Sequence, residues 1–279
     1  MTISDNPDDM RDLERAVALL SATPVIIKIS NTVGSSIEAG INRLPDKVRA
    51  GLHAAAEKGL LKAIELAEKT LEPAQQQART TSHLFAVAAS GAVGGFFGFT
   101  GLIVEIPVTT TVMMRSIQDI ARSEGHDIGA RDVQLECLSV FSHGSKSNAD
   151  DDGADAGYYA GRAAIAELIS ETAKSLGKLA ASKAAKGMSA TAAGQWLAKL
   201  IHTIATRYGV VITEKAVLQA APIVGAVTGA AVNSLFMDFY QDTARGHFIV
   251  LRLEKRYGQA AVQQQFERLL RQRHEKIPA

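Results

Sequence analysis

Apolar residues form two long uncharged runs in an otherwise polar chain. The first run covers residues 84–104 and the second covers residues 216–237. Each is about as long as a helix that crosses a bilayer, which needs about 20 residues. Both runs are rich in glycine, and each glycine inside a helix costs about 1 kcal/mol relative to alanine. We therefore expect a second helix to pack closely against each run, or the run itself to bend.

Small residues recur at four-residue spacing in both runs, as small-xxx-small rows that bring helices close together. The glycine pairs are Gly91 and Gly95, Gly94 and Gly98, and Gly225 and Gly229. Polar side chains and Pro222 interrupt the apolar character of the runs. Three interpretations remain open: two membrane spans, interfacial or re-entrant hairpins, and buried helices of a soluble bundle. The length of the runs together with their polar residues favours the hairpins.

The remaining pattern is helical almost throughout. Apolar positions recur every three or four residues from Pro45 to Leu71, which predicts an amphipathic helix. We expect the first run to end at Pro107, and further breaks at Gly209 and Pro222. Further helices are predicted over residues 12–21, 25–40, 109–125, 131–143, 158–187, 189–208, 210–256 and 260–276. The predicted fold class is all-α, a multi-helix bundle with two Gly-rich hydrophobic helical hairpins.

We expect three parts along the chain. Residues 1–23 form a flexible or amphipathic N-terminal segment, residues 24–258 form the main helical domain, and residues 259–279 form a charged C-terminal helix. The polar, aspartate-rich stretch around residues 144–157 is typical of a loop and divides the main domain into two halves.

Charge differs between the two halves of the chain. Residues 158–279 carry 16 Lys and Arg against 8 Asp and Glu, whereas residues 1–157 carry 14 against 21. Such asymmetry indicates either an interaction face or two halves that neutralise one another on packing. One cysteine excludes a disulfide within the chain, and the acidic start lacks a signal peptide pattern. A cytoplasmic protein is therefore expected.

The usual chemical motifs are absent from the sequence. His53 with Glu57, and Glu136 with His143, share helical faces, but neither pair has a third metal ligand nearby in sequence. No nucleophile elbow surrounds Ser142, and the glycine-rich run lacks the lysine of a phosphate-binding loop. Basic residues are not interleaved with aromatics as nucleic-acid binding requires. We expect no metal, no cofactor and no nucleic acid.

The most informative polar residues directly follow the two runs. Arg115, Asp119 and Arg122 share one helical stripe beyond Glu105. Asp238, Asp242, Arg245 and His247 take the corresponding place after the second run. These residues form either a polar cluster that contacts lipid headgroups or a partner, or ion pairs that hold helices together.

Two stretches resemble the signatures of the EcsC protein family. The first is GFFGFTGLIVEIPVTTTVMMRSIQDIARSEGHDI, with Glu105 and Pro107 among the matching positions. The second spans residues 213–258 and includes Lys215, Asn233 and His247. The resemblance covers roughly residues 40–258; the segment FSHGSKSN after Glu136 departs from the family pattern. The resemblance implies a helical protein of bacterial origin, from a family linked to an ABC exporter and to secretion. It assigns no catalytic residue.

The resulting hypothesis is a membrane-associated helical protein at the inner face of the cell membrane, which binds lipid or a membrane-protein partner, possibly an ABC exporter. The candidate binding residues are Glu105, Arg115, Asp119, Arg122, Lys215, Asn233, Asp242, Arg245 and His247. Two alternatives stay open: a hydrolase-type enzyme with a polar cleft around Glu105, and a fully soluble helical binding protein.

Overall fold

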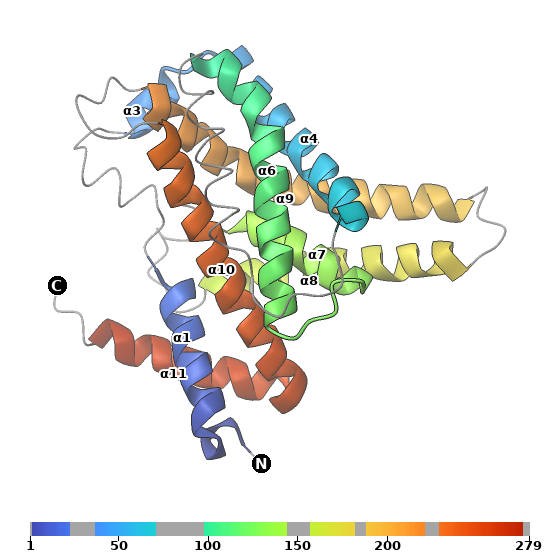
Figure 1. Cartoon of the computed structure of the whole chain (residues 1–279), viewed down its shortest axis with the longest axis vertical. Helices are drawn as coiled ribbons and strands as arrows, with labels where there is room; N and C mark the ends of the chain where they lie inside the picture. The colour runs from blue at the N-terminus through green and yellow to red at the C-terminus, as the bar shows by residue number, and fades with distance from the viewer. Residues whose placement is uncertain are drawn as a thin grey trace.

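The computed structural model describes residues 2–22, 37–70, 98–143, 157–181, 188–220 and 229–275, and all regular structure in these ranges is helical (Figure 1). This confirms the all-α prediction. The elements are η1 (Ile3–Asp5), α1 (Pro7–Leu20), α3 (Ile37–Asn42), α4 (Asp46–Thr70), α6 (Gly98–Ser123), α7 (Arg131–Ser139), η3 (Val140–Ser142), α8 (Gly157–Ala181), α9 (Met188–Ala220), α10 (Gly229–Tyr257) and α11 (Gln259–Glu275).

Helices α6 and α10 lie side by side and run in the same direction (Figure 1). Hydrogen bonds from Asn233 to Glu105 and from Gln241 to Ser116 join them at successive levels, and His126, in the turn that follows α6, contacts the carbonyl of Phe248. Helix α9 runs opposite to α6, because its Lys215 meets Glu105 while its Tyr208 meets Thr110. The three helices therefore form the frame on which the candidate residues are placed.

Helix α4 confirms the amphipathic prediction within a residue at each end. Its buried side chains Leu52, Ala56, Leu60 and Ala63 follow the expected three- and four-residue spacing. It runs parallel to α6, with Gly51 near Ile103 and Gly59 near Pro107.

Glycine allows α4 to pack closely on both α6 and α9. A Cβ on Gly59 would lie 3.3 Å from the Cα of Pro107, and one on Gly209 would lie 2.3 Å from Nδ1 of His53. A larger residue at either position would push α4 away from its neighbour.

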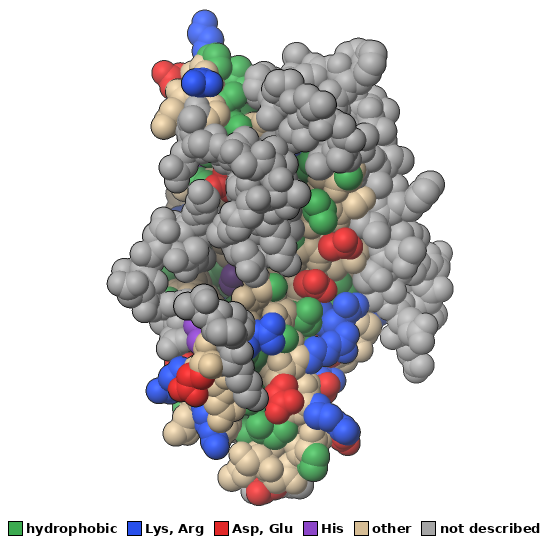
Figure 2. Space-filling model, turned by 90° about the vertical axis from the view of Figure 1, so that its left-hand side faces the viewer, with side chains coloured by type: hydrophobic (Ala, Val, Ile, Leu, Met, Phe, Trp, Pro, Cys, Tyr) green, Lys and Arg blue, Asp and Glu red, His purple; other side chains and the backbone are tan. Residues whose placement is uncertain are grey.

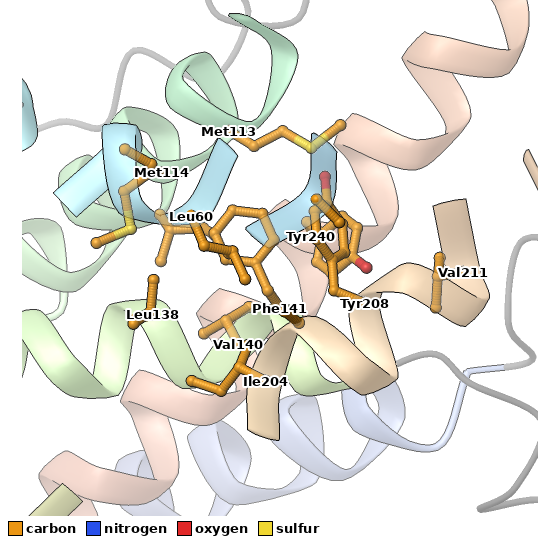
Figure 3. Packing of buried hydrophobic residues seen from close by; sticks show 14 of the residues in the cluster. Leu60, Met113, Met114, Leu138, Val140, Phe141, Ile204, Tyr208, Val211 and Tyr240 are labelled. Carbon is orange, nitrogen blue, oxygen red and sulfur yellow. The ribbon is translucent and has the colours of Figure 1, made fainter. Parts of the chain in front are cut away.

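The main core surrounds a group of three aromatic rings (Figure 3). Phe141 packs against Tyr208 and Tyr240 with ring centroids 5.0 and 5.3 Å apart. Edge and tilted contacts of this kind are favourable beyond the area that they bury. A second, smaller core lies where α1 packs on α10 and α11, with Leu13, Val17 and other apolar side chains buried in it.

Two predicted helix boundaries are wrong. Helix α6 continues through Pro107, although a proline inside a helix removes one backbone hydrogen bond. The hydroxyls of Thr109, Thr110 and Thr111 donate to the carbonyl groups of Ile106 and Pro107, which adds side-chain hydrogen bonds to the turn that contains the proline. Helix α9 continues through Gly209, because the missing side chain there makes room for His53 of α4.

Most of the first apolar run, residues 84–97, lies outside the described residues, as do residues 221–228 of the second. The described parts of the second run belong to two helices, the end of α9 and the start of α10. The closely spaced glycine rows and the hairpins therefore stay predictions. Within the described helices, none combines the length and the apolar character needed to cross a membrane.

Candidate functional site

The structure brings three of the sequence-predicted residues together inside the bundle. Glu105 of α6 accepts hydrogen bonds at Oε1 from Lys215 Nζ of α9, at 3.1 Å, and from Asn233 Nδ2 of α10, at 2.7 Å. All three side chains are buried, and the side chains of Lys215 and Glu105 are 1% and 4% exposed. One carboxylate of α6 thus links two helices whose partner residues lie 110 and 128 residues later in the sequence.

The surroundings of this ion pair are apolar. The Lys215 ammonium lies 5.8 Å from the ring centroid of Phe236, within the range of a cation–π contact. Burial lowers the pKa of Lys215, and the neighbouring Glu105 carboxylate opposes that shift. Glu105 Oε2 has no hydrogen-bond partner among the described residues. The pair is thus held in low-dielectric surroundings where the loss of either partner is costly.

The outer surface of three helices carries no charge at this level, whereas the neighbouring α4 exposes Lys58 and Lys62. We define the uncharged end of the bundle as residues 101–114 of α6, 208–217 of α9 and 231–237 of α10. Its three charged side chains, Glu105, Glu214 and Lys215, are all buried. Valine and leucine are exposed in their place: Val104 is 72% exposed, Val108 48% and Leu235 40%.

Val104 and Val108 are four residues apart and so share one face of α6. Leu235 lies at the same level of the neighbouring α10, two residues beyond the Asn233 that binds Glu105. An exposed apolar group of this kind points to an interaction surface when charges are missing around it.

The other predicted polar residues lie further along the same two helices. Asp119 and Arg122 pair within α6 at 2.7 Å, while Arg115 is partly buried on that helix. Asp242 and Arg245 are partly buried on α10, and Asp242 raises the pKa of Asp238 in addition to the effect of burial. These residues do not reach the Glu105 pair.

His247 has a different partner from any that the sequence suggested. Its Nε2 lies 3.1 Å from Glu136 Oε2 of α7, and its Nδ1 lies 2.8 Å from the Tyr158 hydroxyl of α8. Burial raises the pKa of Tyr158, so this phenol keeps its proton and is available as a donor to Nδ1. The other ring nitrogen then carries the proton that is donated to Glu136. His143, earlier considered with Glu136, instead stacks on Tyr158.

Sequence reasoning missed the residues around His247. Arg162 of α8 binds Glu254 of α10 through both guanidinium nitrogens, at 2.8 and 2.7 Å, and Tyr159 donates to the same carboxylate. These partners are 92 to 95 residues apart, so no local spacing could have identified them. Among the residues that the structure describes, no three His, Cys, Asp or Glu side chains gather in a group that could hold a metal ion.

Comparisons with known proteins give one result. No curated protein and no solved structure matches this chain at a significant level. In the comparison with protein families, residues 21–253 match the EcsC protein family.

Proposed function

This chain belongs to the EcsC protein family, and from that premise we propose that it attaches reversibly to an anionic membrane surface through the uncharged end of the bundle. The carrying observation is that this end buries all its charged side chains and exposes Val104, Val108 and Leu235. The Glu105–Lys215 pair is central to the proposal, because it removes the one charge of residues 98–114 from the outer surface.

Cations next to this end support the choice of an anionic surface. Arg43 and Lys47 are exposed at the beginning of α4. The preceding α3 packs on α9, where Gly40 contacts Val217 at the uncharged end. Lys and Arg side chains, with acidic side chains beside them, stand at the top of the molecule in Figure 2, the end where α4 and α6 begin. A basic residue close to an anionic surface contributes about 1 kcal/mol.

The expected attachment is weak. Transfer of the partly exposed Val104, Val108 and Leu235 side chains into lipid is worth about 2–4 kcal/mol in total. With about 2 kcal/mol from two cations, the sum is about 4–6 kcal/mol, equivalent to a dissociation constant between about 1 mM and 0.04 mM. Attachment of this strength is reversible and sensitive to salt.

The proposal is tested by flotation of the purified protein with vesicles of phosphatidylcholine alone or with added phosphatidylglycerol. We expect the protein to float with the anionic vesicles and to be released by 0.5 M NaCl. Val104→Asp with Val108→Asp should abolish flotation, because it places two charges on the apolar face. Ala261→Asp, at an exposed position of α11 at the other end of α10, is the control and should float normally.

A protein that stays at the bottom of the gradient with both kinds of vesicle contradicts attachment to lipid. If it then sediments with membranes that contain their proteins, a membrane-protein partner is the better interpretation. An enzyme with a cleft at Glu105 is disfavoured by the burial of that carboxylate against Lys215. The family's link to an exporter remains an expectation about partners.

A further inference from the structure

A separate cavity lies between α7 and α8, near the first residue of α11. Its volume is about 370 Å³, within the range of small-molecule sites in proteins. Glu136 and Asp132 of α7 line one side, Arg162 and Tyr159 of α8 line another, and Ala166 and Ile169 provide apolar wall. The cavity therefore combines charged groups with an apolar surface, and it is independent of the uncharged end.

The cations at this cavity are already occupied. Arg162 is bound through two nitrogens to Glu254, and Lys174 lies 2.7 Å from Glu171. Both cations are therefore paired with carboxylates and do not favour an anionic ligand.

The carboxylates of Glu136 and Asp132, in contrast, have no Lys or Arg partner in an ion pair of the described residues. Glu136 receives hydrogen bonds from His247 and Ser139, and its carboxylate lines the cavity. Asp132 lies four residues before Glu136, on the same face of α7, and is exposed. Four carboxylates, those of Glu136, Asp132, Glu254 and Glu171, thus lie at or beside the cavity against the two cations Arg162 and Lys174, which leaves an excess of negative charge.

The carboxylate of Glu136 is also held in position. Burial acts to raise its pKa, but the contact with His247, the charge of Arg162 and the hydrogen bond from Ser139 together outweigh burial, and the pKa lies below its ordinary value. The His247 ring is fixed in turn by Tyr158, which packs against Phe266 at a centroid distance of 5.5 Å. An ionised carboxylate on a rigid support, above an apolar wall, has the features of a binding site for an organic cation.

From this arrangement we infer that the cavity binds a small organic cation, a primary ammonium with a short hydrocarbon body. The ammonium binds Glu136, with Asp132 at the entrance, and the hydrocarbon lies along Ala166 and Ile169. The side chains of Arg162 and Tyr159, fixed by Glu254, limit the length of the ligand.

The probe is n-hexylammonium chloride, measured by isothermal titration calorimetry and by saturation-transfer NMR without vesicles. We expect saturable binding, at least tenfold weaker binding of 1-hexanol and still weaker binding of hexanoate. Glu136→Gln, which keeps the shape and removes the charge, should weaken hexylammonium binding at least tenfold. Glu167→Gln, the same change at an exposed position of α8, is the matched control and should bind as the unchanged protein does.

A second variant makes the test independent of the stability of Glu136→Gln. Ala166→Leu fills the cavity from an exposed helical position and should abolish binding while both carboxylates remain. The inference is overturned if hexylammonium fails to bind, if hexanoate binds equally well, or if neither Glu136→Gln nor Ala166→Leu changes the affinity. Failure of membrane flotation has no bearing on these results, because the two surfaces share no residue.

Discussion

Replacement of Lys215 by methionine tests the buried ion pair directly. Methionine keeps the length and apolar stem of the side chain but removes the ammonium that lies 3.1 Å from Glu105. At an effective dielectric constant of about 20, the attraction between unit charges at that distance is about 5 kcal/mol. Lys215→Met forfeits this attraction and leaves the Glu105 carboxylate buried, with Asn233 as its remaining hydrogen-bond donor.

We expect Lys215→Met to lower the free energy of unfolding by about 3–5 kcal/mol. The assay is urea denaturation followed by circular dichroism at 222 nm. Because an isolated buried carboxylate has a raised pKa, the deficit should shrink as the pH is lowered from 7 to 5 and the folded state takes up a proton. The double variant Lys215→Met with Glu105→Gln should recover most of the loss, since it leaves no buried charge at this position.

The matched control is Lys174→Met, the same chemical change in a surface pair. Lys174 lies 2.7 Å from Glu171, with its side chain 61% exposed. Surface pairs of this kind contribute about 0–1 kcal/mol. The reasoning is refuted if Lys215→Met costs no more than Lys174→Met, or if the double variant is as unstable as the single one.

Further predictions concern helix contacts and acid stability. Gly246→Ala should lower the unfolding free energy by about 1–3 kcal/mol in urea denaturation, because its Cβ would lie 2.7 Å from Cγ of Leu20. Gly177→Ala, whose Cβ would have no atom within 4 Å, should instead raise the unfolding free energy by about 0.5–1 kcal/mol. Equal effects of the two substitutions would contradict the close contact of α1 with α10. Burial lowers the pKa of His143 to about 3, so the unfolded chain binds a proton near pH 6.5 that the folded chain does not, and stability should fall as the pH drops below 6.5. His143→Asn should remove up to about 3 kcal/mol of that loss between pH 6.5 and pH 4; the exposed His202→Asn should not, and parallel pH profiles for all three proteins would refute this cause.

The sequence predicts helices well where local patterns determine them. Pro45 and the spacing of Leu52, Ala56 and Leu60 are sufficient to place α4, since a proline begins the helix and one face is apolar. At Gly209 the local preference is overridden by a contact from α4, and at Pro107 the helix continues with additional hydrogen bonds from the hydroxyls that follow. The close approach of His53 to Gly209 cannot be read from either residue alone.

For the candidate site, too, the sequence predicts individual residues but not the contacts between distant ones. The sequence and the family resemblance identify Glu105, Lys215 and Asn233 as separate positions, but their contact depends on the relative direction of three helices. His247 is identified without its partner Glu136, which lies 111 residues earlier. The cavity at α7 and α8 has no signal in the sequence, because alanines such as Ala166 fit an ordinary helix face equally well.

The most direct test of membrane attachment places a probe at the proposed contact. Cys137 is the only cysteine in the sequence; its thiol is buried, and burial raises its pKa well above the ordinary value. Val104→Cys therefore provides a single reactive thiol for an environment-sensitive fluorophore. With anionic vesicles at low salt, we predict a blue shift at position 104 and no shift for the same label at Ala261→Cys on α11. An unchanged spectrum at position 104 while the protein floats with the vesicles, or an equal shift at both positions, would contradict attachment through the uncharged end.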